Sequence, residues 1–367
     1  MLQQSSQQFY QINPNKFLYK TQPSDGCVFS LLLGKRIFGF KVEVDKKRGK
    51  HGIRIFMIRV SIVAESCNAY YYVRKVNNML KLIAIDLDGT LLNEGHQISE
   101  ENIKAIRQAE QQGIEVVIAT GRSYFDAHAI CGKVGLANYI ISCNGASIHS
   151  REGQQISAIK MEKHDVEHIM KWLEDRNFYY EVSTNNGIYA PCAGRGILEL
   201  ELEELKGTSS EKNVVDLQKL IELMYGQLGM VFVNQYQEFI SQEDVFYKIL
   251  ACSFDEVKRK NGVEQFKGMK QLSMASSTDS NFELVSQKAS KGNALEMLAA
   301  QLKIPFDQVM AIGDSPNDIS MLERVKYSVA MGNAKEEIKA LCNFVTHTNG
   351  KNGVAHAIYQ AIDANVN

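Results

Sequence analysis

Residues 81–92 read Lys-Leu-Ile-Ala-Ile-Asp-Leu-Asp-Gly-Thr-Leu-Leu, and this stretch decides the fold. Residues 82–85 form a continuous apolar run, which is typical of a strand buried on both faces of a parallel sheet. Asp86 and Asp88 follow at the carboxyl end of that strand, where ligands bind in open α/β sheets. The stretch therefore predicts a parallel sheet with a candidate site at one edge.

The two acids allow two interpretations. In a metal-assisted site, Asp86 would attack a substrate and Asp88 would transfer protons. In the other interpretation, Asp88 and Gly89 form a turn after the strand, and both carboxylates are solvated. Choosing between them requires the rest of the chain.

The composition is that of a globular protein, with 367 residues, of which 45% are hydrophobic and 23% charged. This length predicts two domains and an appendage. Seven cysteines are scattered singly, so neither a disulfide framework nor a zinc site is expected, and a reduced, cytoplasmic setting follows. No run approaches the roughly 20 apolar residues of a membrane span, and the polar N-terminus lacks a secretory signal.

Residues 1–78 differ chemically from the rest of the chain. They carry 13 Lys and Arg against 4 Asp and Glu, although the whole chain has a net charge of -1. The basic run at 46–50 has two interpretations, a nucleic-acid-binding arm or simply a solvated segment, and we favour the latter. Because Met79 directly precedes the first strand of the sheet, residues 1–78 are expected to be an N-terminal extension that is poorly packed, disordered or absent from the native protein.

From Met79 onward, strand and helix patterns alternate, which predicts an α/β fold with a Rossmann-like parallel sheet and helices on both faces. Between 163 and 277 the pattern changes to helices with hairpin-forming strands, and Asn185-Asn186-Gly187 is a hairpin signal. The predicted organisation is a core of 79–162 and 278–367 with an inserted α+β unit of 163–277. Further core strands are expected at 114–119, 139–142, 282–285, 309–312, 327–330 and 344–347.

Four polar clusters stand at the ends of predicted strands or helices: Asp86 with Asp88, Thr120, Lys291, and Asp314 with Asp318. Each cluster alone has a simpler explanation. Thr120-Gly121 would be a turn, and Lys291 a surface lysine behind the helix-capping Ser290. Together they are harder to dismiss, because the acids of 313–318 bring like charges together, which is unfavourable without a cation.

The residue types in these clusters match what phosphoryl transfer requires. Asp86 and Asp314 can supply the hard oxygen ligands that Mg²⁺ prefers. Thr120 and Lys291, with backbone N–H groups around Leu87, can stabilise charge on the transferred group. Asp88 is then free to protonate the leaving oxygen and afterwards to activate water.

The chain resembles the Cof-type branch of the haloacid dehalogenase-like phosphatases, which carry a large α/β cap. The resemblance lies in four ordered motifs and in the insertion between the second and third. It covers essentially 79–367 and leaves residues 1–78 outside. The motifs are Asp86-Leu87-Asp88-Gly89-Thr90, Thr120 in Ala-Thr-Gly-Arg, Lys291 in Ser-Lys-Gly-Asn-Ala-Leu, and Gly313-Asp314-Ser315-Pro316-Asn317-Asp318, together with Asn144-Gly145-Ala146.

The resemblance implies a role for each matching residue. Asp86 would be the nucleophile and Asp88 the general acid and base. The implied ligands of Mg²⁺ are Asp86, the carbonyl of Asp88, Asp314 and Asp318. The expected substrate-binding residues are Leu87, Thr120, Gly121, Lys291 and Asn317.

The resemblance also implies a mobile cap that closes over the site and contacts the leaving group. Lys248, on a predicted strand of the cap, is either a substrate contact or an exposed edge lysine.

The expected function is that of a Mg²⁺-dependent phosphomonoesterase acting on small phosphorylated metabolites, such as sugar phosphates or pyridoxal phosphate, through an aspartyl-phosphate. One alternative is a phosphosugar mutase, since the same four motifs serve both reactions. A third hypothesis is an inert regulator that binds a phosphorylated ligand or nucleic acid. The expected partner is a small metabolite, without membrane or nucleic acid, and the protein is expected to be a monomer or homodimer.

Overall fold

The computed structural model describes residues 80–206, 211–240, 243–276 and 278–366, and before them the backbone of five strands between Phe17 and Val73. The chain divides into two compact units, Met1–Asn78 and Met79–Asn367. Within the described ranges, no helix has both the length and the apolar character needed to cross a bilayer.

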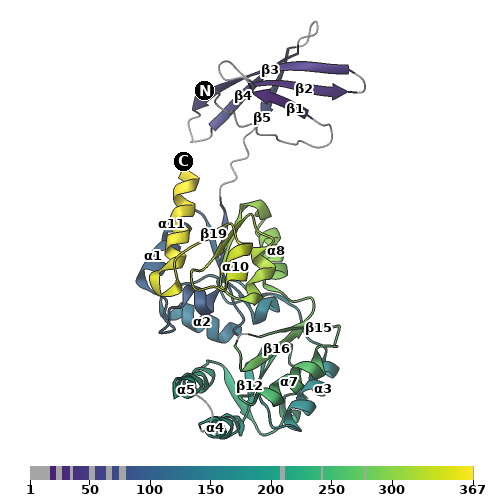
Figure 1. Cartoon of the computed structure of the whole chain (residues 1–367), viewed down its shortest axis with the longest axis vertical. Helices are drawn as coiled ribbons and strands as arrows, with labels where there is room; N and C mark the ends of the chain where they lie inside the picture. Colours follow the sequence, from purple (N-terminus) through teal and green to yellow (C-terminus); the bar gives the residue numbers. More distant parts are fainter. Residues whose placement is uncertain are drawn as a thin grey trace, which may run out of the picture. The chain divides into compact units, whose positions relative to one another are not determined.

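The first unit contains one antiparallel sheet in which each strand pairs with the next along the chain (Figure 1). The expectation that residues 1–78 are poorly packed concerns side chains outside the described residues, so it stays a prediction. The strands are β1 (Phe17–Thr21), β2 (Cys27–Leu33), β3 (Arg36–Arg48), β4 (Arg54–Ile62) and β5 (Asn68–Val73).

The second unit is built on an eight-stranded sheet in the order β10-β9-β8-β7-β6-β17-β18-β19. Six neighbouring strands of this sheet are parallel: β8, β7, β6, β17, β18 and β19. The antiparallel hairpin of β9 and β10 extends the sheet beyond β8. The strands are β6 (Leu82–Ile85), β7 (Glu115–Ala119), β8 (Tyr139–Ser142), β9 (Ser147–His149), β10 (Gln155–Ala158), β17 (Val309–Gly313), β18 (Tyr327–Ala330) and β19 (Phe344–Val345).

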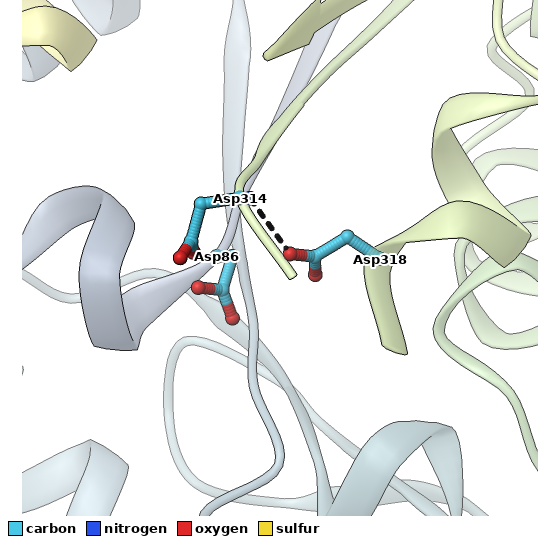
Figure 2. A group of neighbouring side chains, drawn as sticks. All are labelled: Asp86, Asp314 and Asp318. Carbon is cyan, nitrogen blue, oxygen red and sulfur yellow. Dashed lines mark hydrogen bonds between the residues drawn. The ribbon is translucent and has the colours of Figure 1, made fainter. Parts of the chain in front are cut away.

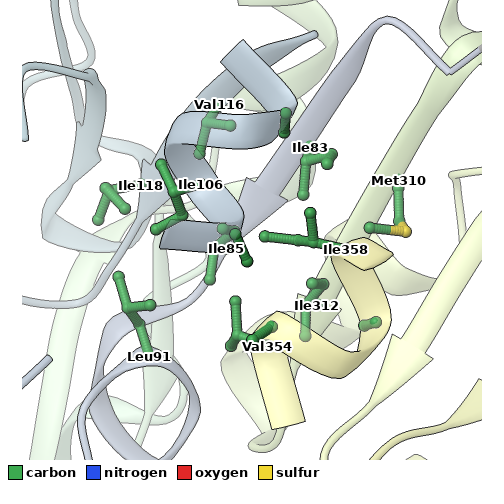
Figure 3. Close-up of a cluster of buried hydrophobic side chains, with 14 of the residues drawn as sticks. Ile83, Ile85, Leu91, Ile106, Val116, Ile118, Met310, Ile312, Val354 and Ile358 are labelled. Carbon is green, nitrogen blue, oxygen red and sulfur yellow. The ribbon is translucent and has the colours of Figure 1, made fainter. Parts of the chain in front are cut away.

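Helices cover both faces of this sheet, because successive strand residues point to opposite sides. Ile83 and Ile85 pack in one cluster, as Figure 3 shows for their neighbours Ile106 and Ile358, with residues of α1 (Glu100–Gln111), α2 (Tyr124–Lys133) and α11 (Gly353–Val366). Leu82 and Ala84 pack on the other face with residues of α8 (Lys291–Gln301), α9 (Ile319–Leu322) and α10 (Glu336–Leu341).

The structure confirms the predicted α/β fold with an inserted α+β cap. The cap has a mixed sheet in the order β13-β12-β11-β14-β16-β15, and its helices include α3 and α7 on one face and α4 and α5 on the other. The strands are β11 (Tyr179–Thr184), β12 (Ile188–Pro191), β13 (Met230–Val233), β14 (Phe246–Cys252), β15 (Leu272–Ala275) and β16 (Asn281–Ser286). The helices are α3 (Lys163–Glu174), α4 (Gly194–Leu205), α5 (Glu211–Tyr225), α6 (Gln237–Ile240) and α7 (Glu256–Phe266).

One predicted strand lies in a different sheet from the one expected. The run 282–285 forms β16, but β16 pairs with β14 and β15 of the cap instead of joining the core sheet. The return to the core sheet therefore falls after Ser286 and not at 278. The reason is physical, because a short apolar run predicts a strand without specifying its pairing partner.

Candidate active site

The sequence clusters meet at the carboxyl edge of the core sheet. Asp86 directly follows β6, and Thr120 directly follows β7. Asp314 directly follows β17, which pairs with β6 on the side opposite to β7. Because parallel strands end at the same edge of a sheet, three separate parts of the chain deliver polar side chains to one place.

Lys291 lies at the centre of this edge. It is the first residue of α8, where Ser290 caps the helix by accepting a hydrogen bond from the backbone N–H of Asn293 at 3.1 Å. Its side chain is completely buried, and Nζ donates to Asp86 Oδ1 at 2.6 Å and to Asp318 Oδ1 at 2.7 Å. Burial opposes the charge of Lys291, but the two carboxylates outweigh burial and raise its pKa.

The loop after β17 holds Asp314 and Asp318 in a defined arrangement (Figure 2). Asp318 Oδ2 accepts hydrogen bonds from the backbone N–H groups of Asp314 and Ser315, at 2.9 and 3.0 Å. Asp314 Oδ1 accepts a hydrogen bond from the Thr90 hydroxyl at 2.8 Å. Gly89 lies so close to Asp314 that a Cβ at this position would lie 2.4 Å from Asp314 Oδ2.

Asp86, Asp314 and Asp318 form the only group of three or more possible metal ligands among the described side chains, with one oxygen from each within 4.8 Å of the others. Asp86 Oδ2 is buried and accepts no hydrogen bond from the described residues. Burial and the charge of Asp318 raise the pKa of Asp86 well above its usual range, and the same two causes raise the pKa of Asp314 to about 6. This excess of buried negative charge and the unpartnered oxygen fit a divalent cation.

Asp88 is not part of this cluster and binds Arg122 instead. Its carboxylate accepts two hydrogen bonds from Arg122, from Nε at 2.7 Å and from a terminal guanidinium nitrogen at 2.6 Å. The Asp88 side chain is 47% exposed. Partial desolvation opposes its ionisation, but the hydrogen bonds and charge of Arg122 outweigh this effect and lower the pKa of Asp88. Arg122 also donates to Asp126, and Asp126 accepts a hydrogen bond from the backbone N–H of Leu228 in the cap.

The remaining predicted residues surround these carboxylates. The Thr120 hydroxyl is buried and accepts a hydrogen bond from the backbone N–H of Arg122 at 3.1 Å. The Leu87 side chain is buried in the core, so only its backbone is available to a ligand. Asn317 donates to Asn144 Oδ1 at 3.0 Å and accepts from the Ser315 hydroxyl at 2.6 Å.

A cavity of about 390 Å³ lies between the core and the cap. Its core side includes Asp86, Asp88 and Asp314, and its cap side includes Lys248 and Glu283. Lys248 is 6% exposed, and its Nζ donates to the carbonyl of Gly121 at 2.7 Å. The cap strand therefore carries a buried lysine that contacts the loop after β7, and the edge-lysine interpretation is wrong.

The comparisons with known proteins agree with this geometry. Residues 83–358 match the family described as haloacid dehalogenase-like hydrolase. The chain belongs to the haloacid dehalogenase-like hydrolases. It is similar to the phosphatase YwpJ of Bacillus subtilis, with 46% identity over 279 residues that cover 76% of this chain and 98% of that protein.

Other relatives of this hydrolase carry more specific names. The 5-amino-6-(5-phospho-D-ribitylamino)uracil phosphatase YwtE of Bacillus subtilis is 37% identical over 283 residues, which cover 77% of this chain and 98% of YwtE. A solved haloacid dehalogenase-like hydrolase from B. subtilis is 44% identical, with a TM-score of 0.68 and coverage of 76% and 99%. The hydrolase is thus a phosphatase of the Cof-type branch.

The cavity of this hydrolase is also lined by residues for which the sequence predicts no role, among them Arg122, Glu181 and Glu283. A signal exists for each of them. Arg122 follows Thr120-Gly121 at a predicted strand end. Glu181 and Glu283 each stand between apolar or aromatic neighbours in a strand, where a buried acid needs a partner or a ligand.

Proposed function

We propose that this hydrolase is a Mg²⁺-dependent phosphomonoesterase of small phosphorylated metabolites, such as sugar phosphates or pyridoxal phosphate. Asp86 attacks the phosphorus atom and forms an aspartyl-phosphate, while the P–O bond to the leaving group breaks. Water then attacks the aspartyl-phosphate, which releases inorganic phosphate and restores Asp86. The name of the relative YwtE, a 5-amino-6-(5-phospho-D-ribitylamino)uracil phosphatase, supports a phosphorylated small molecule as the substrate.

The observation that carries this proposal is the environment of Asp86. One oxygen is held by Lys291 at 2.6 Å, and the other is buried without a partner among the described residues. Burial and the charge of Asp318 raise the pKa of Asp86, and the ammonium group of Lys291 acts in the opposite direction, towards the ionised form that can attack. Lys291 thus orients the nucleophile and leaves one oxygen for the reaction.

Asp86, Asp314 and Asp318 are the side chains proposed to hold Mg²⁺, with the carbonyl of Asp88 as a further oxygen ligand. Mg²⁺, when bound, neutralises charge on the phosphoryl group. Because Asp318 is held by two backbone N–H groups, it serves to position the loop as well as to complete the charge of the site. Thr90 holds Asp314 in place through its hydroxyl group.

Asp88 is proposed to give a proton to the leaving oxygen and then to take one from the attacking water. In the structure its carboxylate accepts two hydrogen bonds from Arg122, which lower its pKa. Before Asp88 can donate a proton, its hydrogen bonds with Arg122 must break. Arg122 also binds Asp126, and Asp126 accepts a hydrogen bond from the cap, so this step is connected to the position of the cap.

Replacing the nucleophile tests this proposal. The Asp86→Asn enzyme should lose at least about 10³-fold in kcat on a panel of phosphate esters, because an amide oxygen does not form the aspartyl-phosphate. Release of inorganic phosphate with and without Mg²⁺ measures the loss. Mass spectrometry of acid-quenched wild-type enzyme should show one added phosphoryl group, on the peptide that contains Asp86.

The matched control is Asp165→Asn, which changes a buried aspartate of the cap helix α3 that accepts a hydrogen bond from Gln271. It should keep its activity. Ordinary Mg²⁺-dependent activity in Asp86→Asn would refute the assigned nucleophile. If a hexose phosphate yields its isomer instead of free phosphate, the enzyme is a mutase and not a hydrolase.

A further inference from the structure

The cap side of the cavity is formed by one face of the cap sheet. In an antiparallel sheet, residues opposite each other lie on the same face. Glu181 on β11 lies opposite Leu250 on β14, and Leu250 lies opposite Glu283 on β16. Lys248 lies two residues from Leu250 and so shares this face. These four side chains all line the cavity, where they form a polar floor with one apolar member.

The charges on this floor are unequally compensated. Glu181, Lys248 and Glu283 are the charged cap residues among the described residues that line the cavity. Lys248 and Glu283 pair with each other at 3.3 Å, and Glu283 also accepts a hydrogen bond from Asn144 at 2.7 Å. The pair is therefore nearly neutral, and its contacts are with the core domain.

Glu181 is different because its hydrogen bonds come from neutral groups. It is 4% exposed, and its Oε1 accepts from the Tyr179 hydroxyl at 2.7 Å and from the Gln227 amide at 2.9 Å. Both bonds end on the same oxygen, which leaves Oε2 as an acceptor. Burial raises the pKa of Glu181, so a donor or cation in the cavity would stabilise its ionised form.

An apolar wall stands beside this floor. Leu220, Leu223 and Met224 of α5 line the same cavity. A volume of about 390 Å³ lies within the range of small-molecule sites. The cap side can thus receive the flat or aliphatic part of a ligand against α5 and its polar hydrogens against Glu181.

We propose that this cap surface is a leaving-group site with a charge preference, and that Glu181 is its specificity-determining residue. The site takes neutral or cationic leaving groups that present O–H or N–H donors, and it rejects leaving groups that carry a carboxylate or a further phosphate. The rejection follows because Lys248, the one cationic cap residue among the described residues that line the cavity, is already paired with Glu283 and bound to the carbonyl of Gly121. An anion here would therefore add to an excess of negative charge. This inference rests on the proposed phosphomonoesterase activity and narrows its substrate class.

Three phosphate esters of one shape and different charge test the preference. Pyridoxamine 5′-phosphate has a cationic substituent, pyridoxine 5′-phosphate a neutral hydroxyl, and 4-pyridoxic acid 5′-phosphate a carboxylate. The kcat/KM of the wild-type enzyme should be at least about tenfold higher for the amine and the alcohol than for the carboxylate. If 4-pyridoxic acid 5′-phosphate is hydrolysed as well as the other two phosphate esters, the proposal is overturned.

The variant Glu181→Gln assigns the preference to one side chain. It keeps the shape and removes the charge, so the amine-to-carboxylate ratio of kcat/KM should fall by about tenfold. The control is Glu174→Gln. Glu174 likewise accepts a tyrosine hydroxyl and a backbone N–H, from Tyr180 and Tyr236, both at 2.7 Å, but it does not line this cavity. The Glu174→Gln enzyme should keep the wild-type ratio.

Binding measurements separate this inference from the proposed function. Calorimetric titration into wild-type, Glu181→Gln and Glu174→Gln proteins uses the same three esters with Mg²⁺ omitted, so that the preference is measured without turnover. If the wild-type enzyme releases no phosphate from any ester, the proposed function fails, and the order of affinities still decides the leaving-group site. If Glu181→Gln keeps its thermal midpoint and the wild-type order of affinities, Glu181 does not set specificity.

Discussion

Asp314 illustrates how one residue reports the state of the whole site. Burial and the nearby charge of Asp318 raise the pKa of Asp314 from its ordinary value of 3.8 to about 6. A carboxyl group whose pKa is higher in the folded protein favours folding while it is protonated. That contribution is fully present below pH 3.8 and is lost as pH rises through about 6. Above that pH, the ionised cluster favours a bound cation.

The stabilising effect of Mg²⁺ should therefore depend on pH. At about pH 7.5, added Mg²⁺ should raise the thermal midpoint, whereas at about pH 5 the effect should be much smaller, because protons occupy the carboxylates. Thermal unfolding with and without Mg²⁺ at both pH values measures this. Asp314→Asn should abolish the difference, and an equal Mg²⁺ effect at both pH values would contradict the account.

At the scale of elements, the turn after β8 positions the first residue of α8. Cys143, Asn144 and Gly145 all have positive φ angles, of 50°, 56° and 95°. A Cβ on Gly145 would lie 2.2 Å from the carbonyl oxygen of Ser290, the residue that caps α8. The turn therefore packs directly against the residue that precedes Lys291, and it requires glycine both for its conformation and for this close approach.

The variant Gly145→Ala should displace the start of α8 and with it Lys291. We expect a loss of about 1–3 kcal/mol in the free energy of unfolding, together with a fall in kcat. Urea denaturation and kcat are the measurements. Gly132→Ala is the control, because Gly132 lies in α2 with no atom within 4 Å of the place that a Cβ would take, and this variant should be neutral or slightly stabilising. Unchanged stability and activity in Gly145→Ala would show that the turn does not position Lys291.

At the scale of the whole molecule, the core and the cap form one compact unit that begins at Met79. The family match, residues 83–358, lies entirely inside that unit. Both faces of the eight-stranded sheet are covered by helices of the same unit. The hydrophobic clusters on the two faces of this sheet are thus built from residues of this unit.

A protein that starts at Met79 should keep its fold, its thermal midpoint and its kcat/KM. The physical reason is that the active site and both sheets of this unit are built from residues after 79. Circular dichroism, thermal unfolding and phosphate release from the same ester panel compare the shortened and the full chain. Loss of folding or activity on removal of residues 1–78 would show that this part supports the enzyme.

Much of the site could be predicted because its signals are local. A buried strand that ends on acids and a serine before a helix each specify a structure over a few residues. Ser290 caps a helix as expected, and Asn185-Asn186-Gly187 joins the antiparallel strands β11 and β12. The carboxyl edge of a parallel sheet then collects the polar ends of several strands without further information.

The sequence by itself determined the α/β core, the inserted cap and the edge at which the polar clusters meet. Only the tertiary structure decided that β16 joins the cap sheet, that Arg122 holds Asp88, and that Glu181 faces the cavity. Strand pairing and side-chain partners depend on residues far apart in the chain. The pattern of apolar residues does not specify with which distant segment a strand pairs. The stretch 81–92 could therefore specify an active-site edge, whereas the cap that would select its substrates had to be seen in three dimensions.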